Sequence, residues 1–145
     1  MPILLFAQTA RLDVEALVGT ARTHGRVELA ATASSPTELS LQLRLEDRVA
    51  TFRARVRPAT AEDHARAEAA ALRGRAGGMD VLARRCPTVW ELEVVDASPR
   101  ETWLLCAALA SALLGPILPP DDATLVGVKG ARLMAQKAAE AETPT

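Results

Sequence analysis

Three consecutive stretches between residues 27 and 56 alternate apolar and polar side chains, and this alternation constrains the fold more than any other feature of the chain. Successive side chains of a strand point to opposite faces of a sheet, so each stretch predicts a strand with one apolar face. The apolar rows are Val27, Leu29, Ala31 and Ala33, then Leu39, Leu41, Leu43 and Leu45, then Ala50, Phe52, Ala54 and Val56. Short turns at 34–36 and 46–48 join them, which predicts a meander whose last two strands pair antiparallel.

Helices and further strands are expected on both sides of this meander. Apolar runs predict strands, and apolar residues at spacings of three and four predict helices. The expected strands cover 3–7 and 88–95, with a short edge strand over 124–128, and the expected helices cover 13–23, 60–73 and 131–140, with an extra helical turn over 79–85.

The clearest helix start is Ser98-Pro99-Arg100-Glu101. It combines a capping serine, a proline at the first helical position and a glutamate three residues after the cap, which is the capping-box pattern. The helix should continue to Leu114, before Gly115. Apolar residues surround it on nearly all sides, so we expect it to be the most buried helix and to hold Trp103 in the core.

The order of these elements predicts an α+β fold with a largely antiparallel sheet and helices packed on one face. The alternative within this class is a ferredoxin-like variant with an added strand. A chain of 145 residues suits one core. We therefore expect a single domain over residues 1–142, followed by a frayed tail over 143–145.

Three segments in the second half of the chain, 89–94, 103–110 and 115–121, together resemble a group of bacterial domains of uncharacterised function. The resemblance covers about the last third of the chain and lies in the apolar pattern. It implies a similar fold and carries no activity with it.

Charge and cysteine usage restrict the partners and the compartment. The net charge of −1 lacks the excess of basic residues with which nucleic-acid binders neutralise phosphates, so no nucleic-acid partner is expected. The longest apolar run, Trp103–Leu114, is shorter than the roughly 18 to 20 residues of a membrane span, and no signal peptide is recognisable at the start. With only Cys86 and Cys106, we expect free thiols and a cytoplasmic location. The many arginines and alanines are typical of a GC-rich bacterium.

No catalytic, metal-binding or cofactor-binding motif is recognisable. The only histidines, His24 and His64, have no second ligand at metal-binding spacing and are interpreted as solvated surface residues. Ser98 and Ser111 lack the glycine-flanked turn of a nucleophilic serine. Cys106 lies in an apolar helix, where burial raises the pKa of a thiol and makes it inert. We therefore predict no catalytic residue, no metal and no cofactor.

The most ordered polar feature is the outward row Arg53, Arg55 and Arg57 of the third strand in the meander. Glu91 and Glu93 form a similar row on the later strand. If the two strands are neighbours, the rows pair across them as ion pairs, which is the favoured interpretation. The alternative is that the three arginines bind an anionic partner.

A second candidate for anion binding is Lys129, in the segment Gly127-Val128-Lys129-Gly130 before the last helix. Backbone amides and one ammonium group there could surround an anion. The segment lacks the glycine spacing of a phosphate-binding loop, so a helix-entry turn is favoured. Asp121-Asp122 is interpreted as a capped, solvated turn, not as a cation site.

These observations leave two classes of function. The first, favoured because no catalytic constellation is recognisable, is a non-catalytic binding, accessory or immunity-type protein whose partner is another protein or a second copy of itself. The second is a small enzyme or ligand-binding domain whose site is assembled from residues distant in the sequence. A deep polar pocket would favour the second, and a shallow apolar or charged surface the first.

Overall fold

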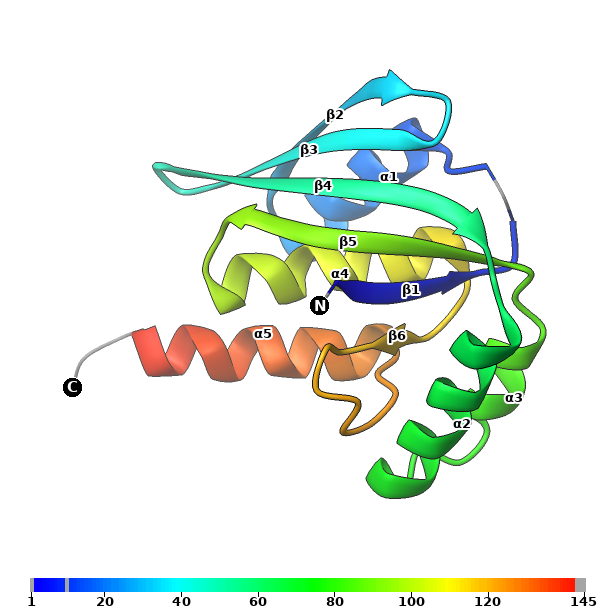
Figure 1. Ribbon diagram of the computed structural model, residues 1–145. Helices are drawn as coiled ribbons and strands as arrows, with labels where there is room; N and C mark the ends of the chain where they lie inside the picture. The colour runs from blue at the N-terminus through cyan, green and yellow to red at the C-terminus, as the bar shows by residue number, and fades with distance from the viewer. Residues whose placement is uncertain (1, 10, 143–145) are drawn as a thin grey trace.

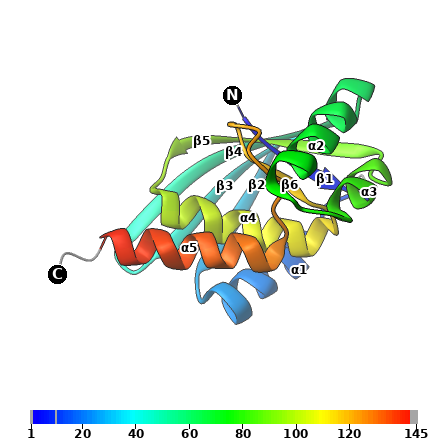
Figure 2. The ribbon, with the colours of Figure 1, turned by 90° about the horizontal axis from the view of Figure 1, so that it is seen from below.

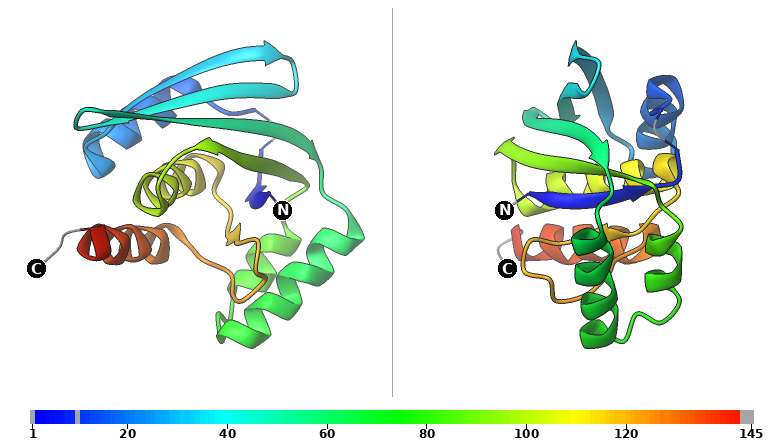
Figure 3. Two further views of the ribbon diagram at one scale, coloured as in Figure 1. Left: turned by 60° about the vertical axis from the view of Figure 1, so that its left-hand side comes forward. Right: turned by 45° about the vertical axis from the view of Figure 1, so that its right-hand side comes forward.

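The computed structural model describes residues 2–9 and 11–142 and has an α+β fold with one six-stranded, fully antiparallel sheet. The sheet order is β2-β3-β4-β5-β1-β6, and the sheet curves over its helices (Figures 1 and 3). The predicted α+β class is confirmed. The strands are β1 (Ile3–Ala7), β2 (Glu28–Ser35), β3 (Glu38–Leu45), β4 (Arg48–Pro58), β5 (Thr88–Asp96) and β6 (Ile117–Leu118).

Five α-helices and one π-helical turn complete the described residues. The π-helical turn extends the first helix up to Arg26, whose left-handed backbone ends it. The helices are α1 (Val14–Thr20), α2 (Ala61–Gly74), α3 (Met79–Arg84), α4 (Pro99–Leu113) and α5 (Val128–Glu142), and the π-helical turn covers Ala21–Gly25. Among the described residues, no helix combines the length and the apolar character that a membrane span requires.

The predicted meander is present, and its strands pair antiparallel. Leu29 of β2 lies opposite Leu43 of β3, and Leu41 lies opposite Phe52 of β4. These four side chains are buried against the helices. The end of β2 departs from the pattern: a bulge between Ala33 and Ser35 shifts the register there, and Ala33 is exposed.

The sheet order differs from that of the ferredoxin-like alternative, which is built from two β-α-β units. Here α4 joins β5 to β6 on either side of β1. Helices α2 and α3, in contrast, join β4 to β5, which are antiparallel neighbours. The expected strand over 124–128 is also wrong: this segment contributes only one bridge, from Val126 to Ile117, and the edge strand is β6 itself.

Helix α4 forms the centre of the core, as its capping box and apolar surface predict. Ser98 and Glu101 exchange both hydrogen bonds of the box. Helices α1 and α5 lie beside α4 on the same face of the sheet (Figure 2). The buried residues of α4 are Glu101, Leu105, Cys106, Ala107, Ala108, Leu109, Ala110 and Leu113.

A second, smaller core lies against the other face of β1. Every residue of β1 is buried, with Ile3, Leu5 and Ala7 facing α4. Leu4 and Phe6 point the opposite way and pack against alanines of α2 and α3. These two helices therefore cover one end of this sheet face, whereas most of the meander is uncovered on the same face.

Trp103 of α4 is only half-buried and packs against the main core, so its ring is less enclosed than expected. We expect Trp103→Ala to lower the free energy of unfolding by about 1 to 2 kcal/mol, because only part of the ring leaves a packed environment. Leu105→Ala, at a fully buried position on the same helix, should cost about 3 kcal/mol. Urea unfolding of the two variants tests which substitution costs more stability, and a larger loss for Trp103→Ala would contradict the prediction.

Candidate functional site

The outer face of the meander, opposite α4, carries the predicted arginine row. Arg53, Arg55 and Arg57 all extend from β4 on this side, and their side chains are 51%, 61% and 30% exposed. No α-helix among the described residues covers the first two. The three arginines therefore differ in environment, although the sequence pattern makes them equivalent.

Strand register places acidic residues directly beside the row. Arg55 lies between Glu38 of β3 and Glu91 of β5, and Arg53 lies opposite Glu93. The ion pair between Arg53 and Glu93 joins atoms 3.9 Å apart, and Arg57 pairs with Glu91 at 3.2 Å. The predicted cross-strand pairing therefore occurs for two of the three arginines.

Glu38 is a member of the site that the sequence interpretation missed. Its carboxylate lies between two guanidinium groups, with Oε1 at 3.3 Å from Arg53 Nε and Oε2 at 3.8 Å from Arg55 Nη2. The signal was present in the sequence, because Glu38 is in phase with the outward-facing Ser40 and Gln42 of the same strand. Glu38 was not included in the predicted row because it directly follows the turn, at the first position of the strand.

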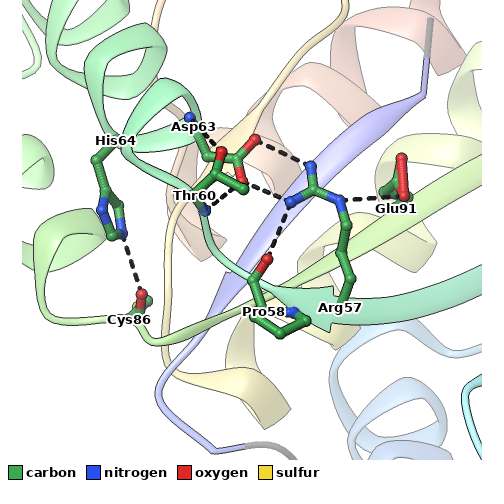
Figure 4. A network of polar contacts seen from close by, with 7 residues as sticks. All are labelled: Arg57, Pro58, Thr60, Asp63, His64, Cys86 and Glu91. Carbon is green, nitrogen blue, oxygen red and sulfur yellow. Dashed lines mark hydrogen bonds and ion pairs between the residues drawn. The ribbon is translucent and has the colours of Figure 1, made fainter.

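Arg57 is held by a dense network that includes α2 (Figure 4). Its two terminal nitrogens donate to the Asp63 carboxylate at 2.5 and 2.9 Å, and its Nε donates to Glu91 at 3.2 Å. Asp63 also accepts the Thr60 amide at 2.8 Å and closes the capping box of α2. Arg57 thus joins the end of β4 to the start of α2, which is a structural role.

Electrostatics agree with this role. The hydrogen bond from Arg57, which outweighs the opposing effect of burial, lowers the pKa of Asp63 from 3.8 to about 2. The same bond raises the pKa of Arg57 above its ordinary value. Both groups are therefore charged throughout the physiological range, and Arg57 is not free to bind a ligand.

A shallow groove lies on the outer face beside Arg53 and Arg55. Its volume is about 440 Å³. Its lining includes residues of β1, β4 and β5, and one wall includes a proline of the segment that follows β6. The lining residues are Pro2, Ile3, Arg53, Arg55, Glu91, Leu92, Glu93, Val94 and Pro120.

The groove contains guanidinium groups with spare capacity. Arg53 and Arg55 make ion pairs at 3.3 to 3.9 Å, but among the described residues neither donates a side-chain hydrogen bond. A guanidinium carries five N–H donors in a planar fork. Arg57, in contrast, uses all three of its nitrogens. The groove therefore offers donors to an additional acceptor.

Lys129 does not join this groove. It is exposed at the start of α5 and lines a separate surface depression with Arg132 and Leu133 of the same helix. The structure therefore brings Arg53 and Arg55 together and leaves Lys129 apart from them.

His64 departs from its predicted surface role. It is half-buried, and its ring stacks on Phe6 with the ring centres 6.1 Å apart. Its Nε2 forms a hydrogen bond with the Cys86 carbonyl oxygen at 3.1 Å (Figure 4). The imidazole thus connects α2 with the turn before β5. The residues around His64 in the sequence are charged and predict an exposed position. Its apolar contact is with a residue of β1, far away in the sequence, so the local pattern could not predict it.

The two acids of the Asp121-Asp122 turn have different partners. Asp121 accepts the Ala123 amide at 3.1 Å, as expected of a turn-capping residue. Asp122 pairs with both arms of Arg66 on α2, at 2.7 and 3.2 Å, and this pairing lowers its pKa. No group of three or more potential metal ligands occurs among the described residues.

Both cysteines are free thiols inside the protein. Burial raises the pKa of Cys86 to about 11 and that of Cys106 to about 12. Thiolate is the nucleophilic form, so these side chains are inert near neutral pH. The interpretation of Cys106 as a packing residue is consistent with its position in the core.

Comparison with known proteins adds no functional assignment: no family model, curated protein or solved structure matches the chain. The resemblance of segments 89–94, 103–110 and 115–121 to a group of bacterial domains stays a prediction. Function must therefore be inferred from the geometry of the outer groove.

Proposed function

We propose that this chain is a non-catalytic binding protein of the bacterial cytoplasm, and that its outer groove binds an acidic segment of a partner protein. The observation that carries the proposal is the pair Arg53 and Arg55, two half-exposed guanidinium groups in one groove that donate no hydrogen bond to any described residue. Charge-assisted hydrogen bonds from arginine to carboxylate are among the strongest that a surface can offer.

The position of Glu38 supports a carboxylate as the bound group. One carboxylate already lies within 4 Å of both guanidinium groups, so their spacing suits this acceptor. Its contacts are long and partly solvated, and exposed pairs of this kind contribute about 0 to 1 kcal/mol. A ligand carboxylate with better geometry can therefore replace or join Glu38 at little cost.

Two prolines in the lining favour a peptide over a free anion. Pro2 is half-buried and Pro120 is exposed, beside the charged side chains of the groove. An apolar side chain next to the ligand's carboxylates would cover this surface and add affinity by leaving water. The proposed ligand is therefore an acidic segment with at least one apolar residue.

Binding is favoured over catalysis by the composition of the lining. Among the described residues, the groove presents no serine, cysteine, histidine or lysine side chain. Its glutamates face the arginines of the row, so no positioned nucleophile with a general base is available. The groove is also shallow, which is typical of a surface for a macromolecule and not of an enclosed substrate site. The free thiols of Cys86 and Cys106 fit a reducing compartment.

The proposal predicts how an acidic probe binds. The probe is a short fluorescein-labelled peptide of alternating glutamate and serine with one central leucine. We expect the double change Arg53→Gln and Arg55→Gln to raise its Kd about tenfold or more, because each lost charge-assisted contact is worth about 1 kcal/mol or more. Fluorescence anisotropy at low salt measures Kd, and added salt should weaken binding.

Two controls make the measurement decisive. Arg132→Gln removes an arginine from α5, on the other side of the sheet, and should leave Kd unchanged. A probe with glutamine in place of every glutamate should bind at least tenfold more weakly than the acidic one, by the same reasoning. Equal binding of the two probes, equal effects of the two sets of variants, or no binding to the unmodified protein would overturn the proposal.

A further inference from the structure

The two edges of the sheet are protected very differently. At one edge, β6 has only two residues and is followed by Pro119 and Pro120. Its outer side is also occupied, because Ile117 exchanges two backbone hydrogen bonds with Val126, at 2.7 and 2.9 Å. Short strands and prolines are devices that prevent an edge from pairing with another chain. This edge is closed.

At the opposite edge, β2 is eight residues long and pairs with β3 on one side only. Among the described residues no strand pairs with its other side, and β2 forms the free margin of the sheet in Figure 1. Alternate residues of an edge strand direct their N–H and C=O groups away from the sheet. A row of unpaired backbone groups therefore lines this margin.

The sequence of β2 contains almost none of the residues that protect an edge. Glu28 is its one charged residue, and the strand contains no lysine or proline. Its outward-facing side chains include Ala30 and Thr32, both exposed and small. The bulge between Ala33 and Ser35 interrupts only the last part of the strand. After Glu28, the straight part up to Ala33 therefore contains no charged residue and no proline that would oppose pairing with another strand.

We infer that β2 is a self-association edge, at which two copies of the chain pair antiparallel about a two-fold axis perpendicular to the sheet. Such an axis requires one strand to be complementary to itself. With Ala31 opposite its own copy, Ala30 lies opposite Thr32 and Leu29 opposite Ala33, and Glu28 lies level with the bulged residue Ser34. No like charges meet, all of these residues except Glu28 and Leu29 are small, and the unpaired backbone groups of the straight part gain partners.

This inference goes beyond the proposed binding function and rests on different residues. The pairing joins two six-stranded sheets into one continuous sheet, with both outer grooves on the same face. The dimer would thus present two arginine pairs to a partner. The edge itself contains neither arginine, so failure of one proposal leaves the other intact.

The test introduces the protection that the strand lacks. In the double variant Ala30→Lys and Thr32→Lys, the new side chains extend into solvent in a monomer but oppose each other twice in the dimer, where like charges destabilise pairing. The matched control is Ala30→Val and Thr32→Val, which keeps the edge neutral and favours strand structure. Sedimentation velocity over a wide range of protein concentration measures the mass, which is 15.4 kDa for one chain.

We expect the unmodified protein and the valine variant to shift from one chain to two as concentration rises, and the lysine variant to stay monomeric. Hydrogen exchange supplies the location: amides of β2 should exchange more slowly at high concentration, and those of β6 should not change. A monomer at every concentration would overturn the inference. A dimer that survives the lysine changes would also overturn it, because the contact would then lie elsewhere.

Discussion

Gly115→Ala is expected to destabilise the fold by about 3 kcal/mol or more, or to prevent folding, because the position has no room for a methyl group. An added Cβ would lie 1.8 Å from the Phe6 carbonyl oxygen and 2.5 Å from the Phe6 carbonyl carbon. Both are backbone atoms of the buried strand β1, which cannot move aside as a flexible side chain would. To make room for the alanine, β1 and the end of α4 must therefore move apart where they cross.

This crossing is held by hydrogen bonds that leave little freedom for displacement. The Phe6 amide donates to Pro116 O at 3.0 Å, and the Gln8 amide donates to Leu113 O at 3.1 Å. They connect β1 with the end of α4 on both sides of Gly115. A shift that relieves the clash would stretch these bonds and disturb the core around Phe6.

Gly19→Ala is the matched control. Gly19 lies inside α1, and nothing approaches its added Cβ within 4 Å. The same substitution should there raise stability by up to about 1 kcal/mol, because alanine is the better helix former. Urea unfolding of both variants provides the comparison. A Gly115→Ala protein within about 1 kcal/mol of the unmodified one would show that the crossing can relax.

The elements that could be predicted from the sequence are those with local signals. Alternation within 27–56 encodes the three strands of the meander, and the Ser98 capping box encodes the start of α4. The turn lengths set the register of neighbouring strands. The position of β1 between β5 and β6 could not be predicted, because it depends on contacts between residues about ninety positions apart. The partial exposure of Trp103 could not be predicted for a related reason: a helix that is apolar on nearly all sides does not indicate which side its neighbours leave uncovered.

The candidate site was predictable to the same extent. The outward direction of Arg53, Arg55 and Arg57 follows from their alternation with buried residues. The alternation does not predict that two of these side chains are half-exposed and the third is anchored, because the third is anchored by Asp63 of the following helix. The unprotected β2 edge was equally hidden, since only the strand order reveals which strand is at the margin.

Asp63→Ala is expected to lower the free energy of unfolding by about 3 kcal/mol at neutral pH. The substitution removes the carboxylate that pairs with the Arg57 charge, and it removes one of the hydrogen bonds of the capping box. The Asp63 side chain is 5% exposed, so water replaces the lost carboxylate only partly. Asp80→Ala is the matched control: it also breaks an aspartate–arginine pair, with Arg84 at 3.2 Å, but that arginine is 59% exposed. Surface pairs of this kind contribute about 0.5 kcal/mol.

The pH dependence of the same variant separates an ion pair from simple loss of packing. The pKa of Asp63 is lowered from 3.8 to about 2 in the folded protein, so the unfolded chain binds the proton more tightly. Its contribution is therefore complete above about pH 4 and is lost as the pH falls toward 2, and it amounts to about 2 kcal/mol. The stability difference between the unmodified protein and Asp63→Ala should shrink by this amount over that window, whereas the difference for Asp80→Ala should change little. Urea unfolding at several pH values measures both differences, and a gap for Asp63→Ala that stays constant down to pH 2 would mean that the carboxylate acts through packing and not through its charge.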